Sequence, residues 1–295
     1  MAATVRPRRS VLYMPGSNAR ALEKARGLPA DGLILDLEDA VAPDAKALAR
    51  DQVVAAVKAR SFGKREVAIR INGLETPWGP DDLAAAAAAG PDAILVPKVE
   101  TADMVHRVEG LMDQAGAPAG TRLWCMIETP LGVLHAEQVA GASPRIAVFV
   151  MGTNDIAKDT GAQHTPMRLP MVTALSLSLL AARAHGIAIL DGVYNDLQND
   201  AGFLETCRQG LEFGFDGKTL VHPRQIGPCN EVFLATPEQL GQAEKIVAAF
   251  AAAEAAGQGV VVVDGRMVEN LHVEQAKRQL ALAQAVADLA ADAAD

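Results

Sequence analysis

The chain has 295 residues, a formal net charge of −9 and a pI of about 5.2, and half of its residues are hydrophobic. This length is enough for one large barrel or two smaller domains with a sizeable core. The acidic balance argues against a nucleic-acid-binding protein, which would present a basic face. The sequence has no recognisable secretory leader and no apolar run near the roughly 18 residues of a membrane span, so we expect no membrane partner. The cysteines Cys125, Cys207 and Cys229 are odd in number and widely separated, which favours a reducing cytoplasm.

Short β-type runs alternate with alanine-rich helical runs over most of the chain. The expected strands are residues 11–14, 32–37, 66–71, 93–97, 123–127, 147–151, 187–190 and 217–221. The expected helices are residues 19–26, 44–59, 80–89, 102–115, 132–139, 169–184, 201–213 and 228–233. Eight successive strand–helix units favour an α/β fold of the (β/α)₈ TIM-barrel type over an open doubly wound sheet. No GxGxxG pattern follows the first strand, which removes the usual reason to prefer a Rossmann fold.

The last part of the chain has a different pattern. A helix is expected over residues 237–256, a short strand over 260–263, a turn at Asp264-Gly265, and a final helix from Val268. We therefore expect a catalytic barrel over residues 1–235 and a C-terminal helical and strand extension over 236–295. A lone strand needs a partner for its backbone groups, and we expect that partner in the barrel or in a neighbouring subunit.

Almost every expected strand ends in a charged or polar residue. In a (β/α)₈ enzyme the active site lies at these strand ends, so they identify the candidate site. The residues are Ser17 with the nearby Arg20 and Lys24, then Asp36, Glu38, Asp39, Arg70, Lys98, Glu128, Asp155, Asp191 and His222.

Glu128 and Asp155 each end an apolar run just as the chain turns. A buried carboxylate is costly unless a positive group meets it. Two carboxylates on successive parallel strands lie side by side, and oxygen ligands of this number suit Mg²⁺. The alternatives are that Asp155 caps a helix from Ile156 onward and that Glu128 faces the positive end of the helix that follows it.

Other residues at the rim also have structural alternatives. Arg70 is either a substrate-binding group or an ion-pair partner of the acidic run 36–39. The turn at residues 16–18 is either a phosphate seat, with Arg20 and Lys24 adding positive charge on one helix face, or an ordinary capped helix with a solvated basic face.

Taken in order, these segments resemble the citrate lyase β-subunit and malyl-CoA lyase family. The matching runs are residues 9–17 (RSVLYMPGS), 35–41 (LDLEDAV), 70–73, 97–99, 127–129, 152–155 (GTND), 191–192 and 222–225. The resemblance implies a Mg²⁺-dependent (β/α)₈ enzyme acting on CoA thioesters, with Mn²⁺ as a substitute ion. It implies that Glu128 and Asp155 bind the metal and that Arg70, Gly152 and Thr153 bind the substrate. Ser17, Arg20 and Lys24 would lie near the CoA phosphates, and the chain would form a homotrimer or hexamer.

Within the family, residues 150–158, 191–195, 215–220 and 262–272 resemble the malyl-CoA thioesterase branch. The family's lyases carry an aspartate in the tail that reaches a neighbouring subunit's site, and this chain has Glu269 there. We therefore expect hydrolysis of (3S)-malyl-CoA, with Glu269 as the water-activating base and the extension as a lid over a neighbour's site. The alternatives are C–C cleavage of malyl-CoA or citramalyl-CoA, and a non-catalytic barrel that binds an acyl-CoA.

Overall fold

The computed structural model describes residues 5–292, which form two compact units. One unit is Arg8–Phe233, and the other runs from Leu234 onward together with the residues before Arg8.

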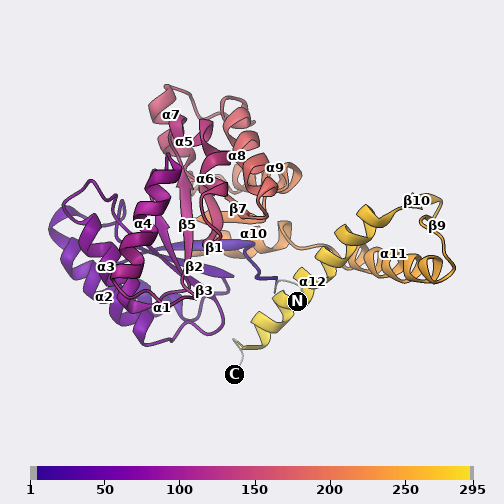
Figure 1. The fold of residues 1–295 in the computed structure, drawn as a ribbon, viewed down its shortest axis with the longest axis horizontal. Coiled ribbons are helices and arrows are strands. Elements are labelled where there is room, and N and C mark those ends of the chain that lie inside the picture. The colour runs from indigo at the N-terminus through magenta and orange to yellow at the C-terminus, as the bar shows by residue number, and fades with distance from the viewer. Residues whose placement is uncertain (1–4, 293–295) are drawn as a thin grey trace. The chain divides into compact units, whose positions relative to one another are not determined.

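The first unit is a closed barrel of eight parallel strands in sequence order, surrounded by helices (Figure 1), which confirms the (β/α)₈ prediction. The strands are β1 (Ser10–Pro15), β2 (Gly32–Asp36), β3 (Glu66–Arg70), β4 (Ala93–Val96), β5 (Arg122–Ile127), β6 (Ile146–Met151), β7 (Ala188–Asp191) and β8 (Gly217–Leu220). Their boundaries lie within one or two residues of the expected ones, because each strand is a short apolar run with turn residues on both sides.

The helices follow the strands along the chain. They are α1 (Ala19–Ala25), α2 (Lys46–Lys58), α3 (Gly79–Ala89), α4 (Ala102–Gln114), α5 (Pro130–Leu134), α6 (Ala136–Gly141), α7 (Thr153–Thr160), α8 (Val172–Ala184), α9 (Asp200–Phe213) and α10 (Ile226–Val232), with single 3₁₀ turns at η1 (Pro43–Ala45), η2 (Leu169–Met171) and η3 (Pro223–Gln225). Within residues 5–292 no helix is long and apolar enough to cross a membrane.

Two of these helical segments differ from the sequence-based expectation. The single helix expected at 132–139 is two helices, α5 and α6, with a break at His135. The short helix α7 was expected only in the alternative that begins a helix at Ile156; it starts earlier, directly after β6, and ends at Gly161, whose φ of +69° is the left-handed conformation that stops helices. Because α7 starts so early, it brings Asp155 back to the strand ends.

Alternate strand residues fill the barrel, and the residues between them pack against the helices. The interior cluster comprises Val11, Ile34, Ala68, Ala93, Leu95, Trp124, Met126, Val148, Val150 and Leu190. Trp124 is the largest of these fully buried side chains. The packed interior closes the barrel beneath the strand ends, so a ligand has access only to the rim.

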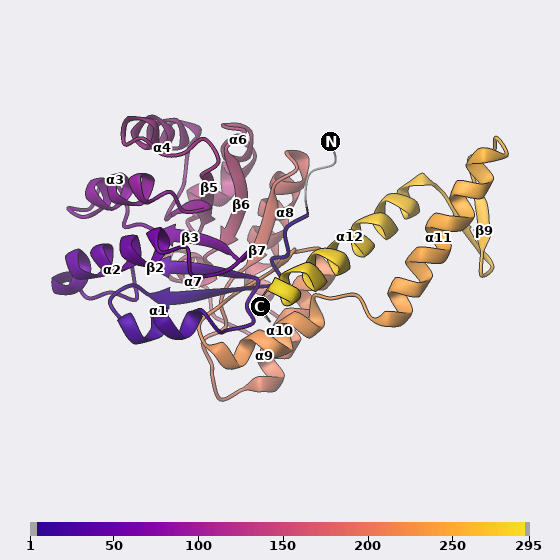
Figure 2. The same ribbon diagram turned by 90° about the horizontal axis from the view of Figure 1, so that it is seen from below.

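The second unit contains α11 (Pro237–Ala255), β9 (Val261–Val263), β10 (Arg266–Val268) and α12 (Asn270–Asp292). The two helices lie side by side, with the β9–β10 hairpin at one end (Figure 2). Phe250, Val263, Val268 and Val273 form a small core of its own.

The expected partner of the strand at 260–263 is wrong. This strand pairs antiparallel with β10, which immediately follows it, in a two-stranded sheet separate from the barrel. Asp264 and Gly265 both have positive φ, +48° and +77°, which is the two-residue turn that joins antiparallel strands. The Asp-Gly pair between apolar residues was the sequence signal for this hairpin, and it also moves the start of the last helix to Asn270.

A buried ion network joins the last two barrel strands. Asp191 and Lys218 are neighbours in the β7–β8 register, with 2.8 Å between Oδ2 and Nζ, and Arg168 donates to both Asp191 oxygens at 2.8 and 2.9 Å. Burial acts to raise the pKa of Asp191, but Lys218 and Arg168 outweigh it and lower that pKa. The Asp191 carboxylate is therefore held between the Arg168 guanidinium and the Lys218 ammonium, which indicates a structural role.

We predict that Asp191→Ala lowers the free energy of unfolding by about 3–5 kcal/mol, because it leaves two cations buried without their carboxylate. The matched control is Glu23→Ala, which breaks the exposed Glu23–Arg26 pair of α1 and costs about 1 kcal/mol or less. Urea unfolding followed by circular dichroism measures both. A loss below about 1 kcal/mol for Asp191→Ala contradicts a structural role for the network.

Candidate functional site

A cavity of about 300 Å³ opens at the carboxyl ends of the barrel strands. It is lined by Tyr13, Asp36, Asp39, Ala40, Arg70, Met126, Glu128, Met151, Gly152, Thr153, Asn154, Asp155, Val193, Asn195, Thr219 and Val221. Four of these side chains are carboxylates and one is a guanidinium, so the cavity has an acidic lining. The structure thus brings Arg70, Glu128, Gly152, Thr153 and Asp155 together, as the strand-end argument expected.

Arg70 is held by the acidic end of β2. It lies opposite Asp36 in the β2–β3 register, and its Nε and Nη2 each donate to an Asp36 oxygen at 2.7 Å. Its Nη1 lies 2.8 Å from Glu38 and 3.4 Å from Asp39. Burial acts to lower the pKa of Arg70, but Asp36, Tyr13 and Glu38 raise it, so the guanidinium stays charged. Arg70 is therefore an ion-pair partner of the acidic run 36–39, as one alternative expected. These ion pairs also fix the guanidinium at the cavity wall.

Glu38 sits beside this guanidinium with its side chain largely buried. Burial raises its pKa to about 8, with Asp39, Glu128 and Asp36 adding to the rise and Arg70 opposing it. Burial is thus the main cause of the raised pKa of Glu38, and the neighbouring carboxylates add to it.

Glu128 follows β5 and is nearly fully buried. Its Oε1 accepts a hydrogen bond of 2.8 Å from the backbone N–H of Lys98. Lys98 has a φ of +49°, a strained conformation for a residue other than glycine, and this turns its N–H toward the carboxylate. Burial and Asp155 raise the pKa of Glu128 to about 7, against the Lys98 N–H, Arg70 and the Lys98 ammonium.

Gly152 explains how the carboxylate fits. The β5–β6 register pairs Ile127 with Met151, so Glu128 and Gly152 face each other one step beyond the strands. A Cβ on residue 152 would overlap the Glu128 side chain. The N–H of Gly152 donates to the Ile127 carbonyl at 3.2 Å, so glycine at this position makes space and does not offer a free donor.

Asp155 lies in the first turn of α7, and the N-cap of that helix is Gly152. The alternative that Asp155 caps the helix is therefore wrong. Its Oδ1 lies 3.7 Å from the ammonium of Lys98. Lys98 thus faces both acidic residues, one through its backbone and one through its side chain.

The Glu128–Asp155 pair fits a divalent cation bound by oxygen. The mutual effect of the two groups, seen in the raised pKa of Glu128, is relieved when a cation lies between them. In the part of the chain that the structure describes, no group of three or more His, Cys, Asp or Glu residues is arranged as a metal cage. Two carboxylates with space for water and substrate oxygens are what Mg²⁺ prefers, whereas a structural zinc site needs four ligands.

The other predicted residues lie apart from this cavity. Ser17 is half-buried in the turn after β1, and Arg20 and Lys24 are exposed on α1, where Asn18 caps the helix through the Ala21 N–H. None of these three side chains lines the cavity. Glu269 belongs to the second unit, where it is half-buried between β10 and α12 and its N–H donates to His272 at 3.1 Å.

Sequence reasoning did not select Tyr13 or Lys46. The Tyr13 ring lines the cavity with the Arg70 guanidinium 4.8 Å from its centroid. Lys46 is buried beneath the loop after β2 and donates at 2.8 Å to the Leu37 and Glu38 carbonyls and to Asn72. Tyr13 lies in the apolar run of β1 and Lys46 opens α2, so neither carries a signal of its role in the sequence.

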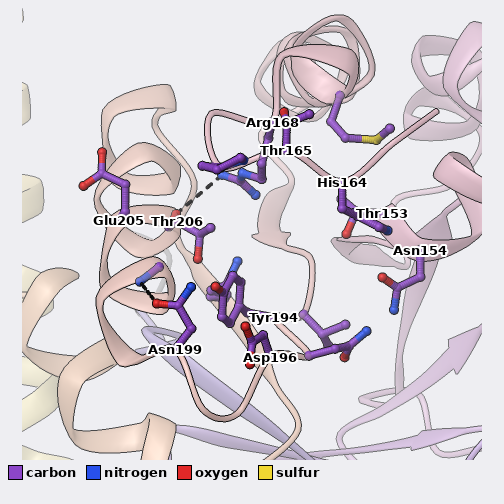
Figure 3. Close-up of a pocket in the computed structure, with 16 residues that line it drawn as sticks. Thr153, Asn154, His164, Thr165, Arg168, Tyr194, Asp196, Asn199, Glu205 and Thr206 are labelled. Atoms are coloured by element: carbon purple, nitrogen blue, oxygen red, sulfur yellow. Dashed lines mark hydrogen bonds between the residues drawn. The ribbon is translucent and has the colours of Figure 1, made fainter.

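A second cavity of about 390 Å³ adjoins the first and shares Thr153, Asn154, Val193 and Asn195 with it. Figure 3 shows side chains of the segment between α7 and α8, such as His164 and Arg168, facing Tyr194, Asn199 and Thr206 of the segment after β7. Its basic residues Arg168 and Lys218 are already paired with Asp191. The two cations of the second cavity are therefore committed to the Asp191 network, while its own carboxylates are Asp196 and Glu205.

The sequence is similar to named proteins over nearly its full length. It is 49% identical over 287 residues to a (3S)-malyl-CoA thioesterase of Cereibacter sphaeroides, covering 97% of this chain and 98% of the relative. It is 37% identical to the citrate lyase subunit beta of Leuconostoc mesenteroides, covering 95% and 94% of the two chains.

The structure is similar to that of CitE from Mycobacterium tuberculosis, which was solved in complex with magnesium, acetoacetate and coenzyme A. The TM-score is 0.74 at 27% identity, covering 93% of this chain and 97% of the other. Residues 9–223 match the family model described as HpcH/HpaI aldolase/citrate lyase. The protein belongs to the HpcH/HpaI aldolase/citrate lyase family.

Proposed function

We propose that this protein hydrolyses (3S)-malyl-CoA to malate and free CoA with the help of bound Mg²⁺. The observation that carries the proposal is the buried Glu128 carboxylate with the half-buried Asp155 carboxylate in an acidic cavity beside a fixed guanidinium. The likeness to a (3S)-malyl-CoA thioesterase at 49% identity supports the choice of substrate. The magnesium and coenzyme A bound to CitE support the choice of metal and of thioester.

In this proposal Glu128 and Asp155 hold the cation, and Mn²⁺ is a substitute. A bound Mg²⁺ supplies a Lewis acid and a template for the oxygen atoms of the malyl group. Arg70 supplies positive charge for the substrate carboxylate or carbonyl from a position fixed by Asp36. Gly152 leaves room for the Glu128 carboxylate, and Thr153 opens α7 with an N–H that has no carbonyl partner inside the helix.

The exposed basic side chains of α1 are proposed to meet the CoA phosphates. Arg20 and Lys24 are four positions apart on this helix, so they share one face, and Ser17 precedes them in the turn. Three free cysteines fit a reducing compartment, and we place the enzyme in the cytoplasm.

Glu269 is proposed to act as the water-activating base in a neighbouring subunit's site, within a homotrimer or hexamer whose C-terminal extensions form lids. The exposed apolar side chains around it favour contact with another protein surface: Val262 and Met267 of the hairpin and Leu271 of α12 are each at least 60% exposed.

The second candidate function is C–C cleavage of malyl-CoA or citramalyl-CoA, which the similarity to citrate lyase subunits favours. The two reactions differ in their products. Hydrolysis releases a thiol and malate, whereas cleavage releases acetyl-CoA and a 2-oxo acid.

The proposal is tested by incubating the purified protein with (3S)-malyl-CoA and Mg²⁺ while free thiol and glyoxylate are followed in parallel. Thiol without glyoxylate is the expected result. Glyoxylate without thiol contradicts hydrolysis and favours C–C cleavage. If neither product forms, hydrolysis is contradicted, and the functions still to be tested are citramalyl-CoA cleavage and non-catalytic binding of an acyl-CoA.

In the same assay Asp155→Ala is expected to lose at least about 100-fold in kcat while its melting temperature stays close to wild type, because it removes one of two proposed ligands of the catalytic ion. The control is Asp159→Ala on the same helix, one turn further on and at its exposed end. Unchanged turnover of Asp155→Ala excludes Asp155 as a metal ligand.

The affinity for Mg²⁺ is expected to rise with pH, because the cation binds the ionised form of Glu128, whose pKa is about 7. Between about pH 6 and about pH 8 the ionised fraction grows, and we expect an affinity gain of about tenfold that levels off at higher pH. Titration calorimetry measures it. The control variant is Glu38→Gln, whose Mg²⁺ affinity is expected to depend on pH as in the wild type. A Mg²⁺ affinity of the wild type that does not change with pH contradicts the assignment of Glu128 as a ligand.

Mixing two inactive variants tests the shared site. Asp155→Ala lacks a metal ligand and Glu269→Gln lacks the proposed base, so each alone is expected to be inactive. If Glu269 acts on a neighbour, random mixed assemblies contain intact sites in about a quarter of positions, and activity returns to about that level. If Glu269 acts within its own chain, every site in the mixture lacks one group and no activity returns.

A further inference from the structure

Tyr13 lies at the wall of the first cavity. It lies on β1, and the cavity that it lines also contains Arg70 and Glu128. Its ring packs against the Arg70 guanidinium, 4.8 Å from centroid to Cζ. Such a cation–π contact fixes the plane of the ring and so the direction of its hydroxyl.

The Tyr13 hydroxyl has a weak partner. It lies 3.9 Å from Sδ of Met126, a thioether sulfur that accepts hydrogen bonds poorly. Nη1 of Arg70 lies 3.8 Å from the same sulfur. Two donors, one neutral and one charged, therefore converge on one point of the cavity lining.

The surroundings of Tyr13 favour the protonated form of its hydroxyl. Burial raises the pKa of Tyr13, with Asp36 and Glu128 adding to the rise and Arg70 opposing it. A phenol held in this way is a hydrogen-bond donor and is excluded as a general base.

We propose that Tyr13 is a catalytic residue that donates a hydrogen bond to the carbonyl oxygen of the bound thioester. The proposal rests on the hydrolytic function proposed above. Water adds to the carbonyl carbon, and the π electrons move to the carbonyl oxygen, where the Tyr13 hydroxyl stabilises the new negative charge. The double bond then re-forms, and the C–S bonding pair leaves with sulfur. One proton of the water ends on the sulfur to give free CoA and the other is released to solvent, while the water oxygen stays in the new carboxylate of malate.

The Tyr13 hydroxyl could donate its hydrogen bond either to a carboxylate of the substrate or to the thioester carbonyl oxygen. A hydrogen bond to a carboxylate that is charged before and after the reaction would strengthen substrate binding alone. A hydrogen bond to an oxygen that gains charge during the reaction strengthens in the transition state and raises kcat. The two cases predict different kinetics for the same variant.

The test is Tyr13→Phe, which removes the hydroxyl and keeps the ring on Arg70. Thiol release from (3S)-malyl-CoA is measured at saturating Mg²⁺ to give kcat and KM. The expected result is a fall of kcat by about 10²–10³-fold, with KM within a few-fold of wild type. The melting temperature and the Mg²⁺ affinity are expected to stay at the wild-type values, because neither depends on the hydroxyl.

Tyr194→Phe is the matched control, since Tyr194 is the other tyrosine of the chain and lines the second cavity. It is expected to retain wild-type kcat. A Tyr13→Phe variant with kcat within twofold of wild type overturns the proposal, and so does a rise in KM alone, which would place the hydroxyl on a ground-state carboxylate. If the wild type releases no thiol, the hydrolytic function fails and the role of Tyr13 fails with it.

Discussion

The site depends on the pairing of Asp36 with Arg70 across the ends of β2 and β3. The register places the two residues opposite each other, and two hydrogen bonds of 2.7 Å join their side chains. This pair neutralises one carboxylate of the rim and fixes the guanidinium against Tyr13. Of the other carboxylates that line the cavity, Asp39 is mostly exposed, and Glu128 and Asp155 face Lys98, whose ammonium-bearing side chain is about half exposed. An excess of negative charge, with the Glu128 carboxylate buried, remains at the strand ends, and a divalent cation is the simplest partner for it.

Much of this arrangement could be predicted from the sequence because parallel barrel strands deliver their carboxyl-terminal residues to one rim. The apolar runs located all eight strands, so Arg70, Glu128 and Asp155 could be placed together before any coordinate was known. Gly152 is the clearest case of a motif residue with a spatial reason, since a side chain there would displace the Glu128 carboxylate. Family resemblance added the substrate class, which no spacing of residues contains.

The parts that could not be predicted depend on contacts between residues far apart in the chain. The ring of Tyr13 on Arg70 and the bonds of Lys46 beneath the β2 loop join segments whose own patterns read as core strand and ordinary helix. His222, which could have been read as a base, accepts the Arg224 N–H through its ring and so caps a turn. The hairpin at Asp264-Gly265 is different, because its signal, an Asp-Gly pair between apolar residues, is present in the sequence and the partner strand immediately follows it.

The central claim is that Glu128 and Asp155 share one divalent cation, and crystals soaked in Mn²⁺ test it most directly through anomalous diffraction. The account predicts one strong peak at the cavity, with a carboxylate oxygen of each residue at a bonding distance of about 2.1 Å and the remaining positions held by water. A peak among Asp36, Glu38 and Asp39, or no peak at this rim at saturating Mn²⁺, would contradict it.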